Sequence, residues 1–159
     1  MRHVDMDRPL QPEFRGMHED PVPRQLTRLT ESTREALTEL EQADAAEQRR
    51  EGLARVQARF AALRQVESSH VEPLLFSQTQ TRGLAAACRK ERNRVTPLLN
   101  ELNRTPVSDP GFRRVLGRFA EALRRLLDRI LDVADNIDRV LSPEHRALLA
   151  QALDQSSPA

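Results

Sequence analysis

The residues best placed to do chemistry are polar side chains that interrupt apolar stripes at helical spacing. Three successive segments each carry one at a corresponding depth: Thr33, Glu67 and Arg92. A buried charge without a partner is strongly destabilising. We therefore predict a shared interior site in which Glu67 and Arg92 form an ion pair and Thr33 adds a hydrogen bond, because a guanidinium fork matches a carboxylate. The alternative is that both charges lie at helix seams and extend to water.

A second set of side chains offers a metal-binding alternative. Glu67, His70 and Glu72 combine an imidazole with carboxylates about one helical turn away, and Glu91 is a further candidate ligand. Two or three ligands on one helix seldom complete a site, so solvated surface residues are the favoured interpretation of these side chains.

Other catalytic patterns are missing from the sequence. Cys88 is the only cysteine, so neither an internal disulfide nor a Cys-rich zinc site can form. It falls on an apolar stripe, which favours a buried small side chain over a nucleophile. No Ser-His-Asp arrangement, phosphate-binding Gly loop or nucleotide fingerprint is present. The expectation is a protein without enzymatic activity.

The longest element that could position these residues spans residues 111–141. Its apolar side chains recur in steps of three and four, and Arg and acidic residues occupy the opposite face. The stripe consists of Phe112, Val115, Phe119, Leu123, Leu126, Ile130, Val133, Ile137 and Leu141. This spacing predicts an amphipathic α-helix that needs partners along its whole length.

Three further helices are predicted upstream, over residues 23–42, 45–69 and from about 79–81 to before Pro106. Pro73 is expected to end or kink the second, and Pro97 to kink or break the third. Residues 105–111 form the clearest loop, in which Ser108 or Asp109 can cap the long helix with Pro110 in its first turn. A short terminal helix is expected to begin at residues 142–143.

These elements predict an all-α fold: an antiparallel up-down four-helix bundle with a short C-terminal helix. Residues 1–23, rich in Pro and acidic residues, are expected to form a flexible N-terminal arm. Residues 24–154 form the bundle, and residues 155–159 a frayed tail.

Composition agrees with helical packing and limits the partners. The 159 residues include five Phe, no Trp and no Tyr. Basic and acidic residues number 25 and 24, so the net charge of +1 gives no reason to expect nucleic-acid binding. No apolar run approaches the roughly 20 residues of a membrane span. Without an apolar signal core at the N-terminus, the expected location is the cytoplasm.

The arrangement resembles the hemerythrin-like family, whose four-helix bundles hold a non-haem di-iron centre. The stretches that carry the resemblance are residues 29–36, 60–76, 90–99, 109–112 and 141–144. The segment 60–76 is similar to the family's His-x-x-x-Glu-Glu-Pro-Leu-aromatic motif, with Glu72-Pro73-Leu74 retained. The family's ligand positions fall on Thr33, Glu67, Val71, Arg92, Leu126 and Ile130, or nearby.

Side chains such as Arg, Val, Leu and Ile offer a metal no lone pair, so the expectation is a bundle without the family's iron. The predicted function is a non-catalytic, metal-free, bacterial-type binding or regulatory module with a protein partner or small ligand, with a homodimer as a further option. One alternative is a metal- or oxygen-responsive protein that binds non-haem iron through displaced ligands. Another is a chaperone-like cradle, because residues 141–145 are similar to the Leu-Thr-Pro-Glu-Gln motif of Spy-type chaperones.

Overall fold

The computed structural model describes residues 22–140 together with residues 143, 144, 147, 148 and 151. Within these residues the chain is helical and contains no strand, which confirms the all-α prediction. Residues 22 and 23 already belong to the first helix, so the predicted N-terminal arm is two residues too long at its C-terminal end. The rest of that arm and the tail 155–159 lie outside the described residues, as does most of the predicted terminal helix.

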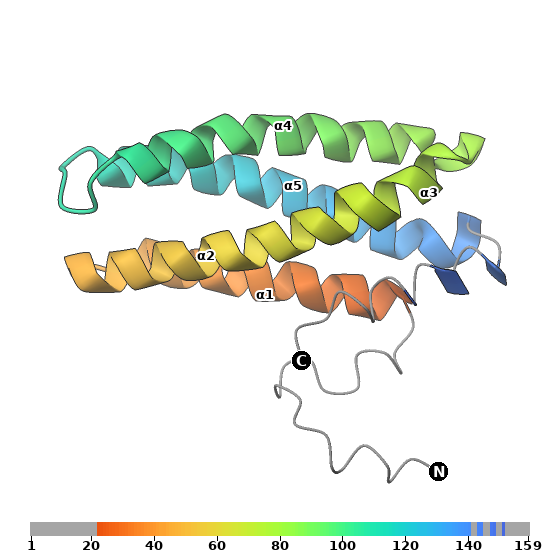
Figure 1. The fold of residues 1–159 in the computed structure, drawn as a ribbon, viewed down its shortest axis with the longest axis horizontal. Helices are drawn as coiled ribbons and strands as arrows, with labels where there is room; N and C mark the ends of the chain where they lie inside the picture. The colour runs from red at the N-terminus through yellow and green to blue at the C-terminus, as the bar shows by residue number, and fades with distance from the viewer. Residues whose placement is uncertain (1–21, 141–142, 145–146, 149–150, 152–159) are drawn as a thin grey trace, which may run out of the picture.

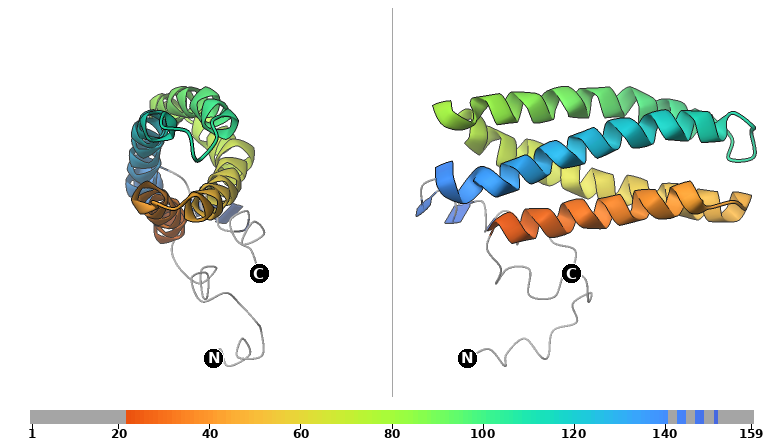
Figure 2. Two further views of the ribbon diagram at one scale, coloured as in Figure 1. Left: turned by 90° about the vertical axis from the view of Figure 1, so that its left-hand side faces the viewer. Right: turned by 180° about the vertical axis from the view of Figure 1, so that it is seen from behind.

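The long helices of the described residues lie side by side around a common axis (Figures 1 and 2). In chain order the elements are α1 (Val22–Gln42), α2 (Ala46–Val66), a π-helical turn (Glu67–Val71), α3 (Glu72–Phe76), a 3₁₀ turn (Thr79–Thr81), α4 (Arg82–Arg104) and α5 (Phe112–Val140). The short α3 continues the line of α2 and ends next to the start of α4. None of the described helices is long and apolar enough to cross a membrane.

The apolar stripe of α5 forms the centre of the core. Its members from Phe112 to Val133 are all buried, and Phe112, Phe119 and Leu123 have no exposed surface. The last two positions of the predicted stripe, Ile137 and Leu141, fall where side chains are not described. Burial at each described position confirms that the three- and four-residue spacing marks the face turned to the other helices.

The four long helices do not pack equally closely. Backbone packing is extensive between α1 and α2, between α1 and α5, and between α4 and α5, whereas α4 meets the α2 side of the bundle mainly through α3. Side chains bridge the remaining α2–α4 seam, including a hydrogen bond between Gln57 and Asn103. At one end Arg49 Nη1 donates to the Val107 carbonyl at 2.8 Å.

Gly52 explains the close approach of α1 and α2. A Cβ atom on this buried residue would lie 3.2 Å from Leu40 Cδ1 and 3.3 Å from Leu40 Cα. The missing side chain lets the α2 backbone rest directly on Leu40, which is itself fully buried.

Pro73 was expected to end or kink the second helix, and Pro97 to kink or break the third. The regular α-helix α2 ends at Val66, and the chain stays helical through the π turn into α3, which contains Pro73. Helix α4 runs through Pro97 without a break, so the break expected there is wrong. Before Pro73 the chain widens into the π turn, in which the Glu72 N–H donates to the Glu67 carbonyl five residues back. The wide turn removes the clash that a proline ring makes with the preceding α-turn. Pro97 is exposed within α4, where water can hydrate the carbonyl that lacks its usual donor.

The loop before α5 forms as predicted, but the first carbonyl of the helical ladder belongs to Gly111 and not to the predicted capping residues Ser108 or Asp109. Asp109 accepts a hydrogen bond from the Gly111 N–H at 2.7 Å, so its carboxylate orders the turn rather than the helix itself. The Gly111 carbonyl accepts from the Val115 N–H at 3.1 Å and begins the helical ladder. Pro110 therefore lies before the first turn of α5, not in it.

Candidate functional site

The most unusual polar feature is a cluster formed by Glu67, Glu72, Arg89 and Arg92. Arg92 of α4 extends towards the π turn and α3, where its Nη1 lies 3.3 Å from Glu67 Oε1 and its Nη2 lies 2.9 Å from Glu72 Oε2. Arg89 Nη2 lies 2.7 Å from Glu72 Oε1. Two carboxylates and two guanidiniums thus join α4 to the segment that follows α2.

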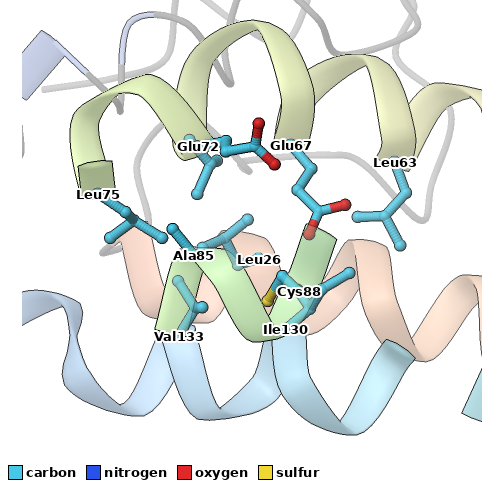
Figure 3. Close-up of a pocket in the computed structure, with 10 residues that line it drawn as sticks. Leu26, Leu63, Glu67, Glu72, Leu75, Ala85, Cys88, Ile130 and Val133 are labelled. Atoms are coloured by element: carbon cyan, nitrogen blue, oxygen red, sulfur yellow. The ribbon is translucent and has the colours of Figure 1, made fainter. Parts of the chain in front are cut away.

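The π turn brings the two carboxylates to one side of their helix. In an α-helix, residues five apart point about 140° away from one another, because each residue turns the chain by about 100°. A π turn holds more residues, so Glu67 and Glu72 are nearly one turn apart. Figure 3 shows both carboxylates reaching from the same helical segment. One guanidinium can therefore contact both.

Glu67 is a buried charge with poorly directed partners. Its side chain is 6% exposed, and that of Arg92 is 12% exposed. Neither Glu67 carboxylate oxygen has a well-oriented hydrogen bond, and the same holds for Arg92 Nη1, so their 3.3 Å contact is electrostatic. Burial raises the pKa of Glu67, and the charge of Arg92 only partly opposes this effect.

Glu72 is the better satisfied of the two carboxylates. Burial works to raise its pKa, but hydrogen bonds and charge from Arg89 and Arg92 outweigh burial and hold the pKa below its usual value. The Arg89 guanidinium also stacks 4.7 Å from the centre of the Phe76 ring, which orients it towards Glu72. For Arg92, the two carboxylates together outweigh burial and raise its pKa, so it stays charged.

A small cavity adjoins the cluster (Figure 3). Its lining is mostly apolar, with Glu67 and Glu72 on one side and Cys88 on the other. The volume of the cavity is about 10 Å³. That volume holds at most one water. Burial, followed by the nearby Glu67 carboxylate, raises the pKa of the Cys88 thiol well above its ordinary value.

Thr33 was predicted to add a hydrogen bond to the Glu67–Arg92 pair, but its hydroxyl bonds elsewhere. It is buried, but its hydroxyl donates to the Leu29 carbonyl of its own helix at 3.0 Å. A hydroxyl has a single proton to donate, so that proton is not available to Glu67. The burial of Thr33 agrees with its position in the sequence pattern, but a Thr within a helix can always bond a carbonyl of the preceding turn instead of a neighbouring helix.

The residues proposed above as alternative metal ligands either pair with arginines or have side chains outside the described part of the structure. Glu91 lies 3.4 Å from Arg94 of its own helix, and Glu72 is held by two guanidiniums. The side chain of His70 is outside the described residues. Among the side chains that are described, no group of three or more His, Cys, Asp or Glu residues could hold a metal ion.

Comparisons with protein-family models, with curated proteins and with solved structures find no match. The class of this protein is therefore described by its architecture alone. Over the described residues it is an all-helical protein with four long helices, and a Glu–Arg cluster lies between α4 and the segment that follows α2.

Proposed function

We propose that this protein is a non-catalytic binding or regulatory module, similar to the hemerythrin-like family, in which an ion-pair cluster replaces the metal centre. The observation that carries the proposal is the position of Arg92. Its guanidinium contacts two carboxylates at 2.9 and 3.3 Å. By the resemblance drawn from the sequence, Glu67 and Arg92 stand at positions where that family has iron ligands. A permanent cation supplied by the chain meets the electrostatic need that a metal would otherwise meet.

An up-down antiparallel arrangement of the four helices belongs to this proposal. Only residues 43–45 join α1 to α2, and only residues 105–111 join α4 to α5. Connections this short between adjacent long helices favour a chain that reverses direction at each one. The resulting bundle acts in the cytoplasm, as a monomer or homodimer, on a protein partner or small ligand.

The chemistry of the cluster supports a role without catalysis. Arg92 has no lone pair for a substrate or metal, and a thiol with a raised pKa such as Cys88 is a poor nucleophile. The adjoining cavity has room for one water and for no substrate beside Glu67.

Iron analysis of the purified full-length protein tests the proposal. We expect far less than one iron per chain after expression in iron-supplemented medium, no oxo-bridge absorption band, and a thermal unfolding midpoint unaffected by a chelator. Stoichiometric iron with a visible oxo band would instead establish the metal- or oxygen-responsive alternative. The variant Arg92→Ala, assayed in the same way, shows whether the guanidinium excludes the metal.

A further inference from the structure

The cavity beside Glu67 has both apolar and polar walls (Figure 3). Its apolar walls are buried side chains from several elements, including Leu26 of α1, Val71 of the π turn and Ile130 of α5. Cavities lined only by apolar side chains stay dry, whereas buried polar groups without protein partners are regularly hydrated. The carboxylate of Glu67 places this cavity in the second group.

Glu67 has unused hydrogen-bonding capacity on the side of the cavity. Its side chain is only 6% exposed, and Figure 3 shows the carboxylate reaching from the π turn towards Cys88 on α4. Among the described residues, neither carboxylate oxygen has a well-oriented hydrogen bond. Arg92 Nη1, 3.3 Å from Oε1, is in the same condition. A buried acceptor left without a donor is destabilising, so this carboxylate favours a donor from within the cavity.

Cys88 supplies a second polar atom, on the opposite wall. Burial, followed by the nearby Glu67 carboxylate, raises the pKa of its thiol, so the sulfur keeps its proton. A thiol is a weak donor and its sulfur a weak acceptor. A buried water typically needs at least about two polar partners, and Glu67 and Cys88 provide them.

Size and charge both restrict what the cavity can bind. Its volume of about 10 Å³ is at the lower limit for one water molecule and excludes anything larger. The adjoining cluster contains two carboxylates and two guanidiniums, so its charge is already balanced. A cation would add positive charge close to Arg92. The suitable ligand is therefore a neutral molecule with one heavy atom and hydrogen-bond donors.

We propose that this cavity is a binding site for one long-lived water molecule, which donates to the Glu67 carboxylate and contacts the Cys88 thiol. A bridging water of this kind is nearly as favourable in enthalpy as a direct hydrogen bond. It completes the bonding that Arg92 alone does not provide. The inference concerns the interior of the bundle and does not depend on the proposed binding role.

Magnetic relaxation dispersion of the water oxygen nucleus tests the inference on the full chain. The method counts water molecules that reside in the protein interior, and exchange of thiol or carboxyl protons does not affect it. We expect Glu67→Met to hold one long-lived water fewer than the unaltered chain, because the strongest acceptor in the cavity is lost. A crystal structure of the unaltered chain should show a density peak in the cavity, within hydrogen-bonding distance of the Glu67 carboxylate.

Glu91→Met is the matched control. Glu91 is also a buried carboxylate, with a side chain 11% exposed, but it lies outside the cavity. This variant removes the same type of group and should keep the water. Equal numbers of long-lived waters in the unaltered chain and in Glu67→Met, or the same loss in both variants, would overturn the inference. If Glu67→Met did not fold, a crystal structure of the unaltered chain without the density peak would overturn it.

Discussion

Arg92 lies 3.3 Å from Glu67, yet neither oxygen of that carboxylate has a well-directed hydrogen bond. The two side chains are 12% and 6% exposed, so the pair has lost most of its hydration. In such pairs the attraction offsets the cost of burial only partly, but loss of one partner leaves the other charge uncompensated. Arg92 is therefore essential chiefly because Glu67 is present.

Replacing Arg92 by methionine should lower the free energy of unfolding by about 3 kcal/mol, because Glu67 then remains buried without a cation. Urea unfolding followed by circular dichroism measures the effect. Arg89→Met is the matched control: its side chain is 52% exposed, and its loss should cost no more than about 1 kcal/mol. Adding Glu67→Leu to Arg92→Met should restore most of the lost stability. A double variant as unstable as Arg92→Met alone would contradict this account.

Glu67 should make the protein less stable as pH rises. Its pKa in the folded protein is raised above the usual 4.5, so the folded state binds the proton more tightly than the unfolded state. The resulting contribution to stability is fully present below pH 4.5 and is lost as pH rises through the raised pKa. Glu67→Gln should remove this pH dependence. Its free energy of unfolding should exceed that of the unaltered protein most at neutral pH. Denaturant titrations at a series of pH values measure it.

Glu72 should show the opposite dependence. Arg89 and Arg92 hold its pKa below 4.5, so its contribution is present above pH 4.5 and disappears as pH falls through the lowered value. Glu72→Gln should therefore destabilise the protein at pH 7 and have a smaller effect in acid. If the two Gln variants showed the same pH profile, the assignment of Glu67 and Glu72 to different environments would be wrong.

Gly52 and Gly117 should respond oppositely to larger side chains. Gly52→Val should cost about 1–3 kcal/mol, because a Cβ there already lies 3.3 Å from the Leu40 backbone. A Cβ at Gly117, on the exposed face of α5, would meet no atom within 4 Å, so Gly117→Ala should stabilise the protein by about 0.5–1 kcal/mol. Thermal unfolding of the two variants measures both effects, and a stabilising Gly52→Val would exclude the close α1–α2 approach.

Pro97→Ala should stabilise the protein by about 1–2 kcal/mol, since it restores the hydrogen bond to the Asn93 carbonyl within α4. The midpoint of urea unfolding should rise with an unchanged dependence on denaturant concentration. The control is Pro106→Ala in the exposed loop, where no helical bond is regained. If both substitutions had the same effect, Pro97 would not interrupt the helical ladder.

Much of the fold could be predicted from periodicity alone. The α5 stripe is buried at every described position, because a helix needs only correctly spaced apolar residues to define its inner face. The depth of Glu67 and Arg92 followed from the same reasoning, and their side chains lie 3.3 Å apart. Thr33 was placed at the right depth, but whether a Thr bonds its own helix or a neighbour depends on a rotamer that spacing does not determine.

The role of Glu72 could not be predicted in the same way. Five residues separate it from Glu67, and regular α-helical geometry places the two on different faces. Only the π turn at Glu67–Val71 brings both to Arg92. The one available signal was Pro73, which was interpreted as an end or kink; a widened turn is a third way for a helix to accommodate proline. Arg89 was missed for a related reason, since its partner was not expected on that face.

The looser packing of α4 against α2 has a mechanical consequence. Along this edge α4 is joined to α2 by the ends of side chains, such as Asn103 with Gln57, and to the π turn after α2 by Arg92 with Glu67. The other three edges are closed by direct packing of the helices. A fluctuation that parts only these tips leaves α5 seated against α1 and α4. We therefore expect local opening along this seam, with exposure of Glu67 and Cys88 to solvent, to require less free energy than opening along the other three edges.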